Sequence, residues 1–412
     1  MPRDARGRRG TRRRPGGPTL AGLWRYARQV LRLAAYLDAP GDGRFAPSIP
    51  ASQLIWTLLG TKVLRTAAYA GVERLTRRAH RAFGLERPIS HDALAYFTDR
   101  LGPDRTRQSA AAVVRRAKRN KTLERSAWIG LVLDGSSFAF CGAKGCAYCH
   151  PSYDAKGNVS TCCHKAVMLS VVATGTKLVL PFDAQLYRAD EGELSAAKTL
   201  LMRGHAAVGP RFADYVVVDG LYAGAPYIHL AGELGLPVVI RLKQNLPELY
   251  TAAHERFEHT SPTHVFQNGK TRVELWDADD FLRWQGLNWP RVRVLRYREH
   301  HSDGTLVDAY WFTNFSIRRV GSKSLYSMAK SRWGIENQGF NEAKNLYGLA
   351  HLPRHTPNSL LIHCLLTALA LTLERLFRLR HLHRGGREPY AAIDLYTILI
   401  SNLFAPAAYD TG

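Results

Sequence analysis

The sequence is poor in acidic residues and lacks long apolar runs. Its 412 residues include 34 Asp and Glu against 57 Lys and Arg, which gives a formal net charge of +23. An excess of this size indicates a polyanionic partner. The longest apolar stretch, Leu360 to Leu373, contains His363 and is too short to cross a bilayer. No single amphipathic basic helix stands out, so we expect nucleic acid and no membrane as the partner.

The amino-terminal segment lacks the apolar core of a signal peptide. Residues 1–17 carry seven arginines against one aspartate. They predict a disordered basic arm, which either contacts DNA or only solubilises the chain. The expected location is therefore cytoplasmic, in association with the nucleoid.

The rest of the chain changes its apolar periodicity several times. The first third repeats apolar residues every three to four positions, which predicts a helical DNA-binding domain with a basic last helix. Short runs of Val, Leu and Ile alternating with helical stretches then predict a mixed α/β sheet with flanking helices. A later stretch alternates like antiparallel strands with Asn-Gly and Asp-Gly turns, which predicts a β-rich insertion. The predicted domains are helical at 18–126, α/β at 127–249 and 321–383, the β insertion at 250–320, and a C-terminal helix and tail at 384–412.

Three acidic residues stand at positions typical of metal ligands. Asp134 ends the apolar run WIGLVL, and Asp219 ends the run YVVV. Glu336 lies in a stretch that is typical of a helix. Carboxylates at the ends of neighbouring strands meet at one edge of a sheet, where a crossing helix can add a third. Each acid alone is equally typical of a turn or a helix surface. Together they predict a site for two divalent ions, which suits phosphodiester chemistry.

Around these acids the chain resembles the DDE transposases of bacterial insertion sequences, in particular the insertion-sequence-four-like group. The resemblance covers roughly residues 125–380, and its motifs are Leu131-Val-Leu-Asp-Gly-Ser136, Val216-Val-Val-Asp-Gly-Leu-Tyr222, Val239-Ile-Arg-Leu-Lys243 and Arg332-Trp-Gly-Ile-Glu336 with Phe340 and Lys344. It implies an RNase H-like catalytic domain with a β-rich insertion before the glutamate helix. It also implies that Asp134, Asp219 and Glu336 hold two Mg²⁺ or Mn²⁺ ions. The implied activity is cleavage of double-stranded DNA at transposon ends and strand transfer into a target, by a homodimer in the DNA complex.

The same resemblance implies residues that contact DNA. Arg332, one helical turn before the catalytic glutamate, takes the role of a phosphate contact. Lys344 falls one position later than the family spacing places its lysine. Ala329 occupies the position of the family's tyrosine, and Tyr326, one turn earlier, is the candidate substitute. Lys243, directly after a predicted strand, is a further candidate.

Cysteine is scarce except in one cluster. Five of the six cysteines lie between positions 141 and 163. Cys146-x-x-Cys149 followed by further cysteines and a histidine is zinc-ligand spacing, so the loop at 141–164 predicts a structural Zn²⁺ site. The predicted ligands are Cys146, Cys149, one of Cys162 or Cys163, and either His164 or Cys141. Cys146-Ala-Tyr-Cys-His150 also fits attachment of a c-type haem, and disulfides are the remaining alternative.

Two other classes of function stay open. The chain could be a catalytically silent, transposase-derived DNA-binding regulator, or a zinc-stapled structural protein that binds nucleic acid. The three acids in one order favour the enzyme.

Overall fold

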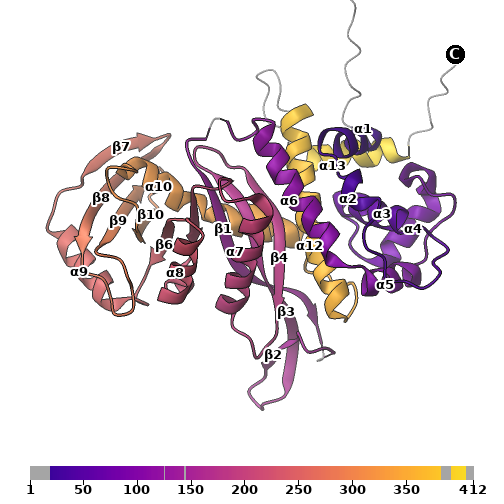
Figure 1. Cartoon of the computed structure of the whole chain (residues 1–412), viewed down its shortest axis with the longest axis horizontal. Coiled ribbons are helices and arrows are strands. Elements are labelled where there is room, and N and C mark those ends of the chain that lie inside the picture. The colour runs from indigo at the N-terminus through magenta and orange to yellow at the C-terminus, as the bar shows by residue number, and fades with distance from the viewer. Residues whose placement is uncertain (1–18, 125, 143–144, 382–390, 405–412) are drawn as a thin grey trace, which may run out of the picture.

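The computed structural model describes residues 19–124, 126–142, 145–381 and 391–404. The arm predicted at 1–17 lies outside these residues, as does much of the predicted C-terminal helix and tail. A helical part lies at one side of the molecule, a long twisted sheet occupies the centre, and further strands extend the sheet at the other side (Figure 1).

Helices dominate the first part of the chain, as the periodicity predicts. They are α1 (Leu20–Arg25), η1 (Tyr26–Val30), α2 (Ala34–Leu37), α3 (Ala51–Val63), α4 (Tyr69–Ala79), η2 (His80–Phe83), α5 (His91–Arg100) and α6 (Pro103–Arg119). The Ser90 side chain caps α5 by accepting a hydrogen bond from the backbone N–H of Ala93, and proline stands at the first position of α6. The basic helix α6 packs on the sheet, where Arg107 bonds Asp183 at 3.1 Å. Part of its positive charge is therefore used inside the fold.

Ten strands form one mixed sheet. They are β1 (Ile129–Cys141), β2 (His150–Tyr153), β3 (Val159–Ala173), β4 (Val179–Tyr187), β5 (Tyr215–Val218), β6 (Val238–Leu242), β7 (His264–Asn268), β8 (Thr271–Phe281), β9 (Val292–His300) and β10 (Leu306–Thr313). Their order is β2-β3-β1-β5-β6-β10-β9-β8-β7, and β4 also pairs with β3. β4, β3 and β1 are antiparallel neighbours, whereas β1, β5 and β6 are parallel. This arrangement confirms the predicted mixed α/β fold with flanking helices.

The strands predicted between 250 and 320 continue the main sheet. Gly269 at φ 63° and Gly304 at φ 84° adopt the left-handed conformation that the predicted Asn-Gly and Asp-Gly turns require. These turns join β7 to β8 and β9 to β10. Because β10 pairs antiparallel with β6, the hairpins extend the edge of the catalytic sheet and form no layer of their own. The helix α9 (Pro247–Glu258) precedes them.

The remaining helices cover the sheet or follow it. They are α7 (Glu193–Val208), η3 (Gly220–Tyr222), α8 (Ala225–Glu233), α10 (Ser322–Ser331), η4 (Ile335–Asn341), α11 (Glu342–Asn345), α12 (Pro357–His381) and α13 (Ala392–Leu403). Within the described residues, Pro357–Arg380 is the one helical stretch long and apolar enough to cross a membrane. Its most apolar window is 94% buried inside the fold, as expected of a core helix.

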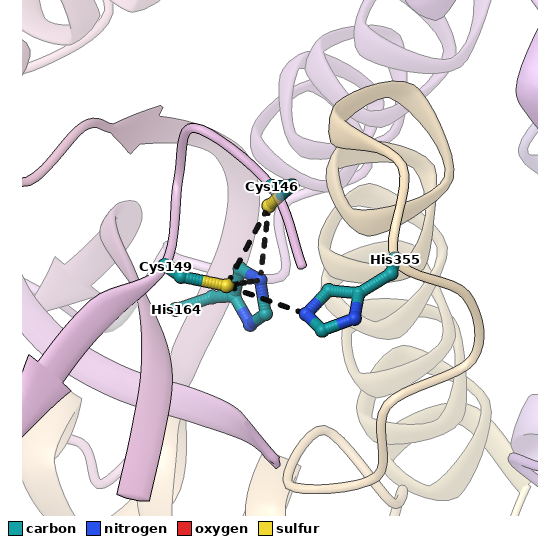
Figure 2. Close-up of side chains that lie close together, drawn as sticks. All are labelled: Cys146, Cys149, His164 and His355. Carbon is teal, nitrogen blue, oxygen red and sulfur yellow. Dashed lines mark hydrogen bonds between the residues drawn. The ribbon is translucent and has the colours of Figure 1, made fainter. Parts of the chain in front are cut away.

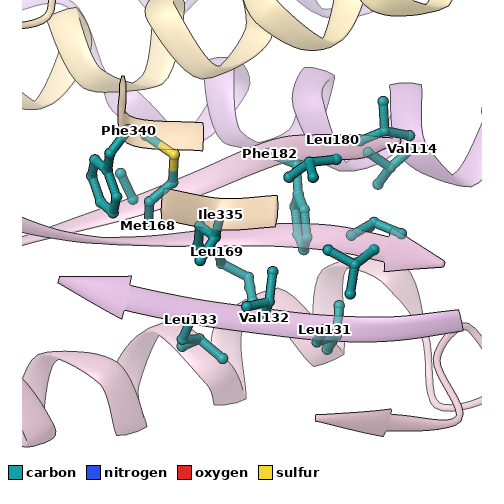
Figure 3. Packing of buried hydrophobic residues seen from close by; sticks show 14 of the residues in the cluster. Val114, Leu131, Val132, Leu133, Met168, Leu169, Leu180, Phe182, Ile335 and Phe340 are labelled. Carbon is teal, nitrogen blue, oxygen red and sulfur yellow. The ribbon is translucent and has the colours of Figure 1, made fainter. Parts of the chain in front are cut away.

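The core lies between the sheet and these helices. Val132 of β1, Leu169 of β3 and Phe182 of β4 are almost fully buried. They meet Val114 of α6 from one side and Ile335 of η4 along the same face (Figure 3). The segment that carries Glu336 is thus held on the sheet by apolar packing.

Candidate active site and Cys/His cluster

The strand register brings Asp134 and Asp219 to one edge of the sheet. The parallel pairing of β1 with β5 ends at Val132 and Val217, and each aspartate lies two residues beyond its partner in that last pair. Because side chains alternate with a period of two, the aspartates project to the same face of the sheet. Asp134 does not end its strand, as the sequence indicated, because β1 continues to Cys141 alongside β3.

Glu336 reaches this edge from η4. This segment is π-helical rather than a regular α-helix, and π-helical turns often occur at functional sites. Ile335 and Phe340 are buried and anchor the segment on the sheet. Gly334 permits the close approach, because a Cβ atom there would lie 2.6 Å from Cγ2 of Val179.

Arg332 links two of the three acids. Its Nη2 donates to Oε1 of Glu336 at 2.6 Å, and its Nη1 lies 3.8 Å from Oδ2 of Asp134. The residue is only 6% exposed. Without metal, the guanidinium predicted to contact phosphate therefore neutralises carboxylates.

Asp134 lies where a negative charge is unfavourable. Burial raises the pKa of Asp134 to about 7, although the guanidinium of Arg332 opposes the rise. Neighbouring carboxylates reinforce it, namely those of Glu336, Glu193 and Asp219. The shared electrostatic effect indicates that these acids form one cluster. Such a cluster lacks positive charge, which a divalent cation would supply.

Asp219 is stabilised as an anion on one side only. Burial raises the pKa of Asp219, but hydrogen bonds from Lys243 and from the backbone of Gly220 outweigh this effect, so the pKa falls below its ordinary value. Lys243 Nζ donates to Oδ2 at 3.0 Å. The other oxygen, Oδ1, is buried and has no hydrogen-bond partner among the described residues. A buried carboxylate oxygen without a donor is suited to bind a metal ion.

The sequence analysis missed a fourth acid, Glu193, at the start of α7. Its carboxylate accepts hydrogen bonds from the hydroxyls of Tyr222 at 2.8 Å and Tyr187 at 3.1 Å. It lies against Gly135, where a Cβ atom would come within 2.1 Å of Oε2. The glycine after Asp134 therefore makes room for Glu193 and does not form a turn. No local signal in the sequence separates Glu193 from an ordinary acid at a helix start.

Lys344 and Tyr326 have different surroundings. Lys344 Nζ donates to Oγ of Ser136 on β1 at 2.6 Å, and burial lowers the pKa of Lys344. It thus lies beside the carboxylates. Tyr326 is 4% exposed, and its hydroxyl donates to Glu299. This placement speaks against the predicted DNA contact, because a long-range partner on β9 already binds the hydroxyl.

The carboxylate edge fits a divalent metal. Asp134, Asp219 and Glu336 offer hard oxygen ligands, the ligand type that Mg²⁺ prefers. The unpaired Oδ1 of Asp219 and the raised pKa of Asp134 both indicate a site that lacks a cation.

A second group of potential metal ligands lies at the far end of β1. It consists of Cys146, Cys149, His164 and His355, whose ligand atoms all lie within 4.8 Å of one another. Figure 2 shows the two thiols and two imidazoles pointing toward one another. We name these four residues the Cys2His2 cluster. Three of them belong to the ligands predicted from the sequence. The fourth, His355, was missed because 191 residues separate it from His164.

Cys162 and Cys163 do not join the cluster, which corrects that part of the predicted ligand set. Cys162 lies in β3 opposite Cys141, two residues before His164. The thiol of Cys163 faces the carbonyl oxygen of His150, because successive side chains of a strand point to opposite faces. The haem alternative also lacks support, since the His150 ring is bound to the Tyr187 carbonyl oxygen at 3.0 Å.

A mixed sheet that gathers carboxylates at one edge is typical of metal-dependent enzymes that act on phosphodiester bonds. The family model described as Transposase DDE domain matches residues 129–373. The chain therefore belongs to the DDE transposase family and is a DNA transposase, an enzyme of the class that uses divalent metal to cleave DNA and transfer its strands.

One solved structure with similarity is described as the cryo-EM structure of piggyBac transposase synaptic complex with hairpin DNA. The similarity extends over 97% of this chain and 84% of that chain, with 11% identity and a TM-score of 0.43. No curated protein sequence matches the chain significantly.

Proposed function

We propose that this transposase belongs to an insertion-sequence-four-like bacterial element and uses Asp134, Asp219 and Glu336 as its catalytic carboxylates. The observation that carries the proposal is the shared register of the two aspartates. Both lie two residues beyond the last β1–β5 pair, and Arg332 links Asp134 to Glu336. The proposed reaction is cleavage at the two transposon ends, followed by joining of the freed 3′-OH to target DNA.

Two Mg²⁺ ions are the proposed metals at this edge, and Mn²⁺ is an expected substitute. Metal bound there would activate the attacking oxygen and stabilise the leaving oxygen. Asp219 would contribute its unpaired Oδ1, and Asp134 would bind as the anion after losing the proton that its raised pKa retains. A structural Zn²⁺ in the Cys2His2 cluster completes the proposed metal content.

The proposed DNA contacts are the cations around the acids. Lys243, Lys344 and Arg332 lie beside the carboxylates, where they can bind phosphates on either side of the reacting bond. The net charge of +23 supplies general attraction to DNA. We propose that two copies act together on paired ends, in the cytoplasm and on the nucleoid.

The proposal is tested by cleavage and joining assays on double-stranded DNA that carries the inverted repeats flanking the gene. Glu336→Gln should reduce Mg²⁺-dependent cleavage by at least about 10³-fold, because it removes a metal ligand. Glu248→Gln, an exposed acid in the first turn of α9, is the matched control and should cleave normally. Cleavage by Glu336→Gln at the wild-type rate would refute the catalytic assignment. Wild-type protein that binds the ends but cuts neither strand would instead identify the silent regulator.

A further inference from the structure

The Cys2His2 cluster has the dimensions of a tetrahedral zinc site. Zn–S bonds of about 2.3 Å and Zn–N bonds of about 2.0–2.1 Å place two sulfurs about 3.8 Å apart and a sulfur and a nitrogen about 3.6 Å apart. The Sγ atoms of Cys146 and Cys149 are 3.8 Å apart. His164 Nε2 lies 3.4 and 3.5 Å from these sulfurs. His355 Nε2 lies 3.3 Å from the sulfur of Cys149. The two sulfurs are much too far apart for a disulfide, which requires about 2.05 Å.

The surroundings hold the ligand atoms in the orientation that zinc requires. His164 Nδ1 donates to the carbonyl oxygen of Ala139 at 2.8 Å, which leaves Nε2 unprotonated toward the cluster. Ala139 has φ 47°, a left-handed conformation that is unfavourable for alanine and turns its carbonyl group at the bulge in β1. The backbone N–H of Gly145 donates to Sγ of Cys149 at 3.4 Å.

Gly145 also makes room for the distant ligand. A Cβ atom at this position would lie 2.2 Å from Nδ1 of His355. Any side chain there would displace the imidazole, so only glycine allows the loop before β2 to pack on His355. The close fit is independent evidence that the loop and the His355 segment meet at this point.

The cluster is separate from the carboxylates and closed by protein ligands. His164 pairs in register with Phe138, four residues beyond Asp134, which is roughly 13 Å along an extended strand. Cys149 and His164 are fully buried. Four protein ligands and no open position are typical of structural rather than catalytic zinc.

His355 lies on the connection between the catalytic helix and α12. It follows Glu336 by 19 residues and directly precedes α12. Its neighbours Arg354 and Thr356 both bind Asp99 of α5. A metal bond at His355 would therefore join β1, β3 and the loop before β2 to the segment that leaves the active site.

We propose that one zinc ion bound by Cys146, Cys149, His164 and His355 locks this connection onto the β1–β3 hairpin. The Glu336-bearing segment is then held at both ends. It packs on the sheet through Ile335 at its start and is tied by zinc at its end, and in between Lys344 bonds Ser136 of β1. The zinc site rests on geometry alone, whereas its effect on cleavage rests on the proposed function.

Metal content tests the site directly. The purified full-length protein should contain about one zinc per chain, and Co²⁺ in its place should show the thiolate charge-transfer and d–d absorption of a tetrahedral S2N2 site. His355→Asn should bring the zinc content below about 0.2 per chain. His351→Asn, an exposed histidine four residues earlier, and Cys163→Ser should keep about one. If His355→Asn does not fold, the Co²⁺ spectrum of the wild type decides. Full zinc in His355→Asn, or no Co²⁺ spectrum in the wild type, would overturn the proposal.

Cleavage assays test the effect on the active site. Removing zinc with a chelator that binds Mg²⁺ only weakly should lower Mg²⁺-dependent cleavage at least tenfold, and added Zn²⁺ but not extra Mg²⁺ should restore it. Unchanged cleavage by zinc-free protein would overturn the locking role. Glu336→Gln should lose cleavage while keeping its zinc. An inactive wild type with one bound zinc would therefore contradict the proposed function and leave the zinc site standing.

Discussion

Replacing Asp134 by Asn should stabilise the Mg²⁺-free protein while abolishing cleavage. Burial raises the pKa of Asp134 from 3.8 to about 7, so ionising this carboxyl opposes folding. A rise of about three pH units, at about 1.4 kcal/mol each, sets an upper limit of about 4 kcal/mol. Relaxation and partial hydration reduce the expected gain at pH 8 to about 2–4 kcal/mol. With an unfolding entropy of about 0.9 kcal/mol/K for a chain of this length, the melting temperature should rise by about 2–4 °C.

The pH dependence follows from the direction of the pKa shift. Below pH 3.8 the carboxyl is protonated in both states, so the substitution makes little difference. Between pH 3.8 and about 7 the folded state keeps a proton that the unfolded state releases, so the stability of the wild type falls as pH rises. The advantage of Asp134→Asn should thus be less than half as large at pH 5 as at pH 8.

Melting curves in buffer without Mg²⁺ measure this effect, with chelator omitted so that the proposed zinc is kept. Asp219→Asn is the matched control and should destabilise, because the pKa of Asp219 is lowered overall. Added Mg²⁺ should raise the melting temperature of the wild type but not that of Asp134→Asn. An Asp134→Asn variant that melts below the wild type at pH 8, or equal differences at pH 5 and pH 8, would refute the reasoning.

Three other substitutions test individual contacts. Glu193→Gln should raise the Mg²⁺ concentration for half-maximal cleavage severalfold, since it removes one negative charge near Asp134; an unchanged Mg²⁺ titration would make Glu193 purely structural. Gly334→Ala should cost about 1–3 kcal/mol in denaturant unfolding and slow cleavage, because its Cβ would clash with a β4 side chain; wild-type stability would contradict the close approach. Arg107→Ala should cost about 3 kcal/mol by leaving the buried Asp183 with one arginine fewer, and a loss under about 0.5 kcal/mol would show that this bond does not join α6 to the sheet.

Local patterns account for much of what the sequence predicted. The apolar runs before Asp134 and Asp219 identified two strands, because buried parallel strands require continuous apolar side chains. The Asn-Gly and Asp-Gly turns identified the later hairpins, because their glycines must adopt positive φ. Glu336 was found through the Arg332-Trp-Gly-Ile-Glu336 motif.

Long-range contacts account for what the sequence did not predict. Tyr326 is one turn from the expected position, but Glu299 of β9 binds its hydroxyl. Glu193 joins the acids only because α7 starts beside Gly135.

The sequence by itself determined the strands, the helices, the basic charge and most of the candidate ligands, because these depend on residue type and on short spacings. Only the tertiary structure decided which side chains share a site. It selected His355 over Cys162 and Cys163, and it put Arg332 between two carboxylates. The physical reason is that a ligand cage is defined by distances of a few ångströms between atoms that lie up to about 200 residues apart, and the strand register and helix packing that set those distances act through the whole fold.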